Sequence, residues 1–285
     1  ALSPPSDRTA SEALSIQRTG RRVLSIQSHV VSGYAGNKCA VFPLQRLNCD
    51  QLRELYEGLS LNKITKYSHI LTGYCGDVTF LSKIGDIVRD LKEKNKDLVY
   101  VCDPVLGDDG VYYTPKELLP KYRDEVIRLA DVVTPNAFEL GELTDLPVTS
   151  EVECLAAMKV LHGWGIPRIV VTSGIPQSSS DSLVTIASTH FPGQAESLRF
   201  RFEYKRVAGN YVGTGDTFAS LLLVNLEDCE GDLNKAVGRV LGSLHNIIET
   251  TRSLNAESTE PLMSKAPELR FIESRKNLLF PPFVV

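Results

Sequence analysis

Short apolar runs alternate along this chain with longer amphipathic stretches, and this alternation restricts its fold more than any other feature. The runs "RVLSIQS" (22–28), "YSHILTGY" (67–74) and "LVYVCDP" (98–104) have the length and residue types of buried strands. Between the last two, residues 77–95 repeat apolar side chains at helical spacing. Strands separated by helices favour a parallel sheet, because a parallel connection has to cross over the sheet.

The same alternation continues to the C-terminal part of the chain. Further strands are expected in four runs: 129–136, 167–174, 182–188 and 198–207. The last two follow each other without a helix, so we predict that they pair antiparallel at one edge. Helices are expected at 39–47, from 137, at Thr214 to Leu226, and at Asn234 to Ser253.

These elements predict an α/β fold with a mostly parallel central sheet and helices on both faces. We interpret residues 22–285 as a single domain, because no stretch rich in Gly, Pro or Ser divides them. Residues 1–21 are interpreted as a disordered tail, with a remnant of an organelle transit segment as the alternative.

Composition argues against several classes of function. The 285 residues are 42% hydrophobic with a formal net charge of -4, so there is no general electrostatic reason to bind nucleic acid or an anionic membrane. The longest apolar runs are far shorter than the roughly 20 residues of a spanning helix. The six cysteines form no C-x-x-C pair, which is typical of reduced thiols in a cytosol-like compartment. We therefore expect small-molecule chemistry in the cytoplasm.

Polar residues follow the predicted strands directly. "DPVLGDDG" with Asp103 follows one strand, "TPNAFE" with Asn136 the next, "TSG" with Ser173 another, and "GTGD" with Asp216 follows "RVAGNYV". In open parallel sheets ligands bind beyond the carboxyl ends of the strands, so these segments are the candidate site.

The "GTGD" segment predicts an anion site. Glycines at a helix start let a ligand approach the backbone, and the first N–H groups together with the helix dipole attract phosphate. Asp216 would then accept the proton of a hydroxyl that attacks a phosphoryl group. The alternative is that Asp216 only complements the dipole of its helix.

Two other segments are ambiguous in the same way. Asn136 and Glu139 have the spacing of a capping box, which needs no function, although Glu139 would also suit the water shell of a divalent cation. The carboxylates of Asp103, Asp108 and Asp109 repel one another unless a cation or a polar network offsets their charge, yet a solvated loop would also tolerate them.

Other phosphate and catalytic signatures are absent from the sequence. "SGYAGNK" at 32–38 has its glycines too close for a G-x-x-x-x-G-K-[ST] loop, and "GTGDTF" lacks the third glycine of a dinucleotide site. H-E-x-x-H, G-x-S-x-G and the protein-kinase signatures are also missing.

Six segments, read in order, resemble the pyridoxal kinase family of the ribokinase-like superfamily: "RVLSIQSHVVSGYAGNKCAVFPLQ", "LTGY", "YVCDPVLGD", "TPNAFE", "VVTS" and "VGTGDTFASLLL". The resemblance covers the chain from Arg22 to about Ser253. It implies transfer of the γ-phosphate of ATP to the 5′-hydroxyl of pyridoxal, pyridoxine or pyridoxamine. It also implies a divalent cation (Mg or Zn), a monovalent one (K or Na) and a homodimer.

The resemblance also implies roles for individual residues. Asp216 would be the general base, with Gly213 and Gly215 in the anion hole. Ser28 and Tyr74 would contact the substrate together with Asp216. The residues expected at the nucleotide are Asp103, Asp108, Tyr113, Asn136, Thr172, Ser173, Val207 and Thr214. Those expected on the metal side are Asp103, Thr134 and Glu139.

The chain departs from the family pattern after Leu47. It passes from "FPLQRL" straight to "NCDQLRELYEGL" and omits about thirty residues, more than ordinary loop variation. A substrate-contacting threonine and part of the lid belong to the omitted stretch in the family, and Ala208 stands where the family often has an acidic residue. A related hydroxymethylpyrimidine-type kinase and a shortened, catalytically impaired binding protein are therefore alternatives, and we expect weak or absent pyridoxal phosphorylation.

Overall fold

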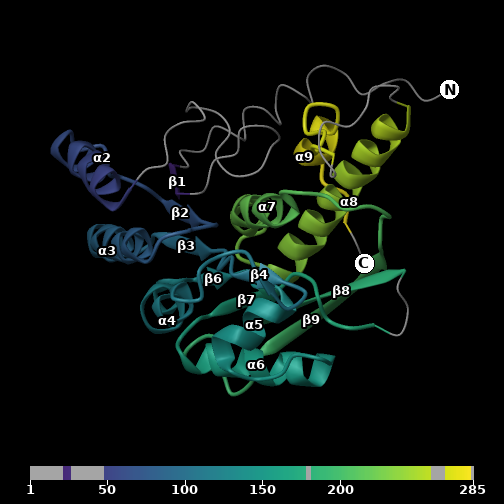
Figure 1. Cartoon of the computed structure of the whole chain (residues 1–285), viewed down its shortest axis with the longest axis horizontal. Coiled ribbons are helices and arrows are strands. Elements are labelled where there is room, and N and C mark those ends of the chain that lie inside the picture. The colour runs from purple at the N-terminus through teal and green to yellow at the C-terminus, as the bar shows by residue number, and fades with distance from the viewer. Residues whose placement is uncertain (1–21, 27–47, 178–180, 258–266, 284–285) are drawn as a thin grey trace.

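The computed structural model describes residues 22–26, 48–177, 181–257 and 267–283. Its centre is a seven-stranded sheet in the order β1-β2-β3-β6-β7-β8-β9 (Figure 1). The strands are β1 (Val23–Ile26), β2 (His69–Thr72), β3 (Val99–Cys102), β6 (Val132–Val133), β7 (Arg168–Val171), β8 (Ser182–Thr189) and β9 (Leu198–Lys205). The pairs from β1 to β7 are parallel, whereas β8 runs antiparallel to β7 and β9. The predicted mostly parallel sheet with an antiparallel edge is confirmed.

Helices cover both faces of the sheet (Figure 1). One face carries α2 (Cys49–Leu61), α3 (Val78–Lys94), α5 (Ala137–Thr144) and α6 (Glu151–Gly163). The other face carries α7 (Thr214–Asp228) and α8 (Leu233–Glu257). Shorter helical segments are α4 (Leu118–Lys121), the π-helical turn η1 (Tyr122–Val126), the 3₁₀ turn η2 (Ile127–Leu129) and α9 (Arg275–Leu279).

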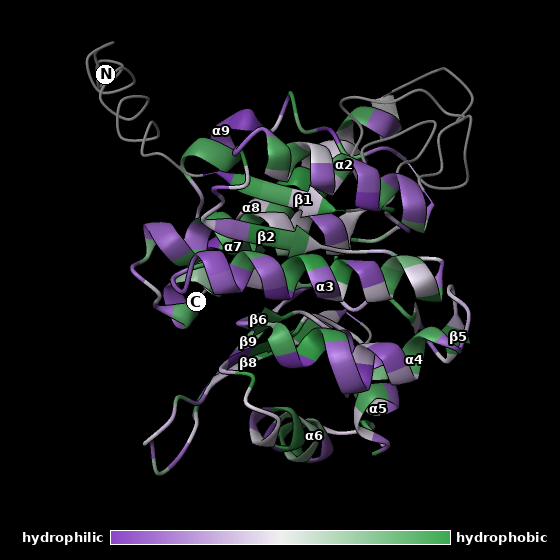
Figure 2. Cartoon of the chain, turned by 90° about the vertical axis from the view of Figure 1, so that its left-hand side faces the viewer, coloured by the Kyte–Doolittle hydropathy of each residue, from purple (hydrophilic) through white to green (hydrophobic). Residues whose placement is uncertain are grey.

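Two hydrophobic cores follow from the two covered faces. Successive strand residues point to opposite sides of a sheet, so Tyr100 and Cys102 of β3 pack with α3 and α5, while Val101 packs with α7 and α8. All three are at most 1% exposed. In Figure 2 the strands β1 and β2 are mainly hydrophobic green, whereas α3 alternates between green and purple along its length. This is the pattern of a buried sheet covered by amphipathic helices.

The predicted helix ends agree with the structure to within a few residues. The helix expected at 77–95 is α3, whose N-cap Asp77 accepts a hydrogen bond from the N–H of Phe80 at 2.8 Å. The two helices expected near the C-terminus are α7 and α8. The helix expected at 39–47 lies outside the described residues. No described helix is long and apolar enough to cross a membrane.

Candidate active site

The register of the parallel strands brings their carboxyl ends together at one edge of the sheet. Thr72 pairs with Cys102, and Cys102 pairs with Val133. The residues that follow these strands, Asp103 and Thr134, are therefore neighbours. The Thr134 hydroxyl donates a hydrogen bond to the Asp103 carboxylate at 3.0 Å, and both side chains are buried.

The pKa of Asp103 is raised well above its ordinary value. Burial is the main cause, because it disfavours the charged form, and the negative charge of nearby Asp216 adds to the shift. The hydrogen bond from Thr134 opposes it. Two carboxylates from distant parts of the sequence, one after β3 and one in the first turn of α7, thus lie close together at this edge.

The start of α7 is built from glycine. Its N-cap, Gly213, has a left-handed backbone with φ of 84°, and no side chain caps the helix. Gly215 lies next to Asp103, since a β-carbon at Gly215 would be 3.7 Å from the Asp103 Oδ2 atom. The first N–H groups of a helix have no partner within the helix, so this end offers a ligand both donors and a close approach. Asp216 and Thr214 are partly buried here.

The start of α5 is closed by side chains. The side chain of Asn136 accepts a hydrogen bond from the Glu139 N–H at 2.8 Å, and the Glu139 carboxylate accepts one from the Asn136 N–H at 2.8 Å. The second Glu139 oxygen accepts from the N–H of Leu106 at 2.9 Å. The predicted capping box is present, and Glu139 in addition joins α5 to the loop after β3.

The pKa of Glu139 is also raised. Burial is again the main cause, followed by the charge of Asp103, while the backbone N–H groups of Asn136, Leu106 and Gly107 oppose the shift. Each of these donors favours the ionised carboxylate. The side chain is 4% exposed.

The segment "GDDGVY", expected to be a loop, forms a small β-hairpin. Strand β4 (Gly107–Asp108) pairs with β5 (Val111–Tyr112), and both turn residues, Asp109 and Gly110, have positive φ. That is the geometry of a tight two-residue hairpin turn, for which Asp-Gly is a common sequence. The signal was therefore present in the sequence.

The hairpin carries two of the predicted nucleotide residues. Asp108 is partly buried, and burial raises its pKa. Tyr113 follows β5, is 61% exposed, and donates its N–H to the carbonyl of Leu106 at 2.8 Å. Both residues lie beyond the end of β3, on the same edge as Asp103.

Thr172 and Ser173 lie at the end of β7 and are partly buried. The N–H of Thr172 donates to the carbonyl of Pro135 at 3.0 Å, and the carbonyl of Ser173 accepts from the N–H of Ala137 at 2.9 Å. These bonds join the end of β7 to the loop that leads into α5. The predicted residues of the "TSG" and "TPNAFE" segments are thus brought together.

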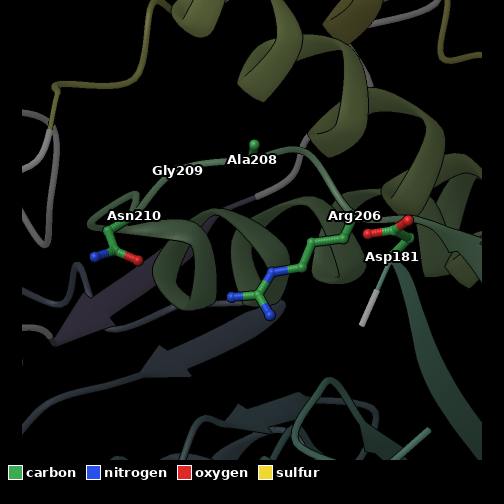
Figure 3. A pocket seen from close by; sticks show the side chains of 5 residues that line it. All are labelled: Asp181, Arg206, Ala208, Gly209 and Asn210. Atoms are coloured by element: carbon green, nitrogen blue, oxygen red, sulfur yellow. The ribbon is translucent and has the colours of Figure 1, made fainter. Parts of the chain in front are cut away.

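A cavity of about 360 Å³ lies beside the loop between β9 and α7. Asp181, Arg206, Ala208, Gly209 and Asn210 line it (Figure 3). In Figure 3 the Arg206 side chain extends away from the Asp181 carboxylate, toward the side where Asn210 lies. Val207, predicted at the nucleotide, is partly buried within this loop.

Of the predicted substrate residues besides Asp216, the structure describes Tyr74 but not Ser28. Tyr74 follows β2 at the same sheet edge and is 37% exposed. Its hydroxyl would be 3.3 Å from a β-carbon at Gly76, so the ring lies across that glycine. Ser28 lies outside the described residues.

The residues present suit a divalent cation that is bound together with a phosphate ligand. Among the described residues, no three His, Cys, Asp or Glu side chains gather into a complete metal site. Mg²⁺, however, is usually held by one or two carboxylates plus substrate phosphates. Asp103 is a buried carboxylate of this kind, to which Thr134 donates a hydrogen bond at 3.0 Å, and a cation held there would favour its ionised form.

The sequence interpretation missed Tyr112 and Glu142. The Tyr112 hydroxyl donates a hydrogen bond to the Glu142 carboxylate. The two residues are 30 positions apart, and no local pattern indicates that they meet. Their contact depends on how the hairpin folds back toward α5.

The mostly parallel α/β sheet with an uncapped, glycine-built helix start beside a buried carboxylate agrees with the expected ribokinase-like fold. A family model described as phosphomethylpyrimidine kinase matches residues 68–261. The chain is 49% identical to a putative pyridoxal kinase of Caenorhabditis elegans over 92% of both chains. It is 38% identical to the human pyridoxal kinase, over 93% of this chain and 97% of the human protein. The chain belongs to the pyridoxal kinase family.

Solved structures agree with this assignment. The pyridoxal kinase of Leishmania donovani, in complex with ADP and pyridoxamine, superposes with a TM-score of 0.80 at 28% identity. The match covers 92% of this chain and 97% of that one. The pyridoxal kinase of Entamoeba histolytica superposes with a TM-score of 0.77 at 27% identity.

Proposed function

We propose that this chain phosphorylates the 5′-hydroxyl of pyridoxal, pyridoxine or pyridoxamine with ATP, giving the 5′-phosphates, among them pyridoxal 5′-phosphate. The observation that carries the proposal is the start of α7, where an uncapped glycine-built helix end and Asp216 lie beside buried Asp103. Membership of the pyridoxal kinase family supports the choice of substrate, and the relative solved with ADP and pyridoxamine supports the choice of donor.

Asp216 acts as the general base in this mechanism. It accepts the proton of the hydroxymethyl group as that oxygen attacks the γ-phosphorus. The bond from the γ-phosphorus to the bridging β–γ oxygen then breaks, and ADP leaves. The N–H groups at Gly213, Thr214 and Gly215 stabilise negative charge on the phosphoryl oxygens, because the helix dipole points its positive end there.

Other residues would bind the nucleotide and its cation. Asp103, with Thr134 behind it, would hold a divalent cation, which supplies charge neutralisation at the phosphates. Four segments would surround the nucleotide. They are the hairpin with Asp108 and Tyr113, the α5 start with Asn136, the end of β7 with Thr172 and Ser173, and the β9–α7 loop with Val207. A monovalent cation and a homodimer complete the proposal, and sedimentation analysis of the purified chain tests the dimer.

The shortened region after Leu47 leads us to propose that turnover is reduced. The alignment with the human relative spans 303 positions, more than the 285 residues of this chain. The relative therefore has residues at positions where this chain has none. A missing wall would admit water and orient the hydroxyl less well. Insertion of a segment from the relative after Leu47 should then raise the pyridoxal phosphorylation rate and leave ADP affinity unchanged. Family-level turnover by the unmodified chain would show that the segment is dispensable.

A hydroxymethylpyrimidine is the second candidate substrate, because the matching family model is described as phosphomethylpyrimidine kinase. Both compounds present a hydroxymethyl group on a nitrogen-containing ring, so the same base would serve either. One experiment separates the two. The purified chain is incubated with ATP, Mg²⁺ and each of the three B6 vitamers or hydroxymethylpyrimidine, and the phosphorylated product is detected by mass. Product from the pyrimidine alone would overturn the proposal.

A further inference from the structure

The β4–β5 hairpin is attached to the start of α5 at its base. The Glu139 carboxylate accepts from the N–H groups of Leu106 at 2.9 Å and of Gly107 at 3.5 Å. The Asn136 amide donates to the carbonyl of Gly107 at 2.7 Å. These contacts fix the point at which the hairpin begins.

The tip of the hairpin stands away from the core. A cavity of about 490 Å³ separates its turn, residues 108–110, from the end of α5 at Gly141 and Glu142. The side chains of Val111 and Tyr113 are 60% and 61% exposed. The tip therefore depends on few side chains for its position.

Tyr112 makes the contacts that bridge this gap. Its ring meets Phe138 of α5 edge-on, with the ring centroids 5.3 Å apart. Its hydroxyl donates to the carboxylate of Glu142, also in α5. The Lys116 ammonium lies 5.1 Å from the ring centroid, within the range of a cation–π contact.

The acceptor side of this contact is itself held in place. Arg123, in the π-helical turn η1, donates from its Nη2 atom to the backbone carbonyl of Glu142 at 2.6 Å. That carbonyl lies in the last turn of α5, where helix carbonyls have no partner within the helix. Glu142 therefore meets the Tyr112 hydroxyl from a fixed backbone.

We propose that Tyr112 is a positioning residue, which latches the hairpin to α5 so that Asp108 and Tyr113 are held over the nucleotide. The inference rests on the proposed function, since the latch matters only if a nucleotide binds beneath it. Tyr112 touches no reacting atom, and its effect on the nucleotide acts through its two neighbours in the hairpin. Burial, followed by the bond to Glu142, raises the pKa of Tyr112, so its hydroxyl keeps the proton that it donates.

The chain contains a matched control for this latch. Tyr56 of α2 donates its hydroxyl to the Asp90 carboxylate of α3, and the Lys94 ammonium lies 5.7 Å from the Tyr56 ring centroid. Because α3 begins after β2 at the site edge, Asp90 and Lys94 in its second half lie toward the opposite edge. The same chemistry thus occurs twice, once beside the site and once remote from it.

The experiment compares Tyr112→Phe with Tyr56→Phe by two measurements. Hydrogen exchange of the hairpin amides, residues 107–113, is followed in the ligand-free protein. The affinity for ADP with Mg²⁺ is measured by calorimetry. Tyr112→Phe should speed exchange of the hairpin and weaken ADP binding by roughly 3- to 10-fold, the range of one charge-assisted hydrogen bond made partly exposed. Tyr56→Phe should change neither.

Each outcome has a defined meaning. Unchanged hairpin exchange in Tyr112→Phe overturns the latch. Faster exchange with unchanged ADP affinity overturns its role toward the nucleotide. A wild-type chain that binds no ADP, while Tyr112→Phe still speeds hairpin exchange, contradicts the proposed function and not the contact itself.

A second variant protects the test against a general loss of folding. Glu142→Gln removes the charged acceptor and should give the same two changes, and the double variant should add nothing beyond the larger single effect. Additive effects would show that the two side chains act separately. The KM for pyridoxal should stay constant across the series, whereas general unfolding would change it together with the nucleotide affinity.

Discussion

Two helices begin at the candidate site, and their first turns are built in opposite ways. In α5 the Asn136 side chain and the Glu139 carboxylate close the helix end by a reciprocal pair of hydrogen bonds. In α7 the N-cap is Gly213, and no side chain caps the helix. Both ends carry an acidic residue in the first turn, Glu139 in one and Asp216 in the other.

The difference separates a structural acid from a candidate catalytic one. Both carboxylate oxygens of Glu139 accept backbone N–H groups, which ties α5 to the loop after β3. Asp216 lies in a turn whose glycines leave space for a ligand. Its negative charge adds to the effect of burial, which raises the pKa of Asp103. We therefore expect the anion at α7 and mechanical support from α5.

Replacing Asp216 by Asn should have the largest effect. Without a general base, phosphorylation of pyridoxal should fall by about 10²- to 10⁴-fold, while ADP affinity stays within a few-fold because the backbone donors remain. Initial rates with mass detection and calorimetry on the same sample check both. Undiminished turnover would remove the assignment of Asp216 as the base.

Gly215→Ala tests whether α7 needs space for its ligand. The new β-carbon would lie 3.7 Å from Asp103 Oδ2, an ordinary contact, so stability should hold. ATP binding should weaken by about tenfold, equal to about 1.4 kcal/mol, because the methyl group occupies the ligand side of the turn. Gly58→Ala in α2, where nothing lies within 4 Å of the added carbon, is the control and should leave binding unchanged. Equal ATP affinity in both variants would contradict an anion site at Gly215.

Glu139→Ala tests the closed helix end. The free energy of unfolding should fall by roughly 1–3 kcal/mol, because buried donors lose their acceptor. The half-saturating Mg²⁺ concentration should also rise, because the loop that follows Asp103 loses its attachment to α5. Glu153→Ala is the control, since Glu153 occupies the same position after the N-cap Ser150 of α6. Thermal unfolding and metal titration measure the two effects. A stability loss with unchanged Mg²⁺ dependence would make Glu139 purely structural.

The smallest effect is a pH dependence of stability in the ligand-free protein. Asp103 and Glu139 have folded-state pKa values raised to about 7 and about 8, above the ordinary value near 4. Between these limits the native state binds more protons than the unfolded state, so stability falls as the pH rises. Asp103→Asn should reduce this pH-dependent loss of stability by on the order of 1 kcal/mol. Chemical denaturation at pH 5 and pH 8 measures the free energy of unfolding of wild type and variant. An equal fall with pH in both proteins would contradict the raised pKa of buried Asp103.

The sheet was largely predictable because hydrophobic patterning is a local property. The runs around β2, β3 and β7 read as strands directly from the sequence, and the polar residues after them lie at one edge as expected. The helices α2 and α6 were missed although Asn48 and Ser150 cap them. The capping box of α2, in which Gln51 reaches back to Asn48, was visible in the sequence.

The segments that form the site were predictable from the sequence, whereas the contacts between them were less so. "GTGD" indicates a helix start that accepts anions, but the proximity of Asp103 to Asp216 depends on the order of strands in the sheet. The raised pKa of Asp103 comes from burial, which no local pattern reports. The contact from Tyr112 to Glu142 likewise needs the folded hairpin.

The rate of a single phosphoryl transfer decides whether Asp216, at the start of α7, performs the chemical step. Wild type, Asp216→Asn and Glu139→Ala are each saturated with ATP, Mg²⁺ and pyridoxal, and the first turnover is followed by rapid quench and mass detection. Because binding and release are excluded, the rate reports the chemical step alone. We expect that Asp216→Asn loses this step and that Glu139→Ala retains most of it once saturated. A fast first turnover in Asp216→Asn, with loss in Glu139→Ala, would contradict the assignment of transfer to the start of α7.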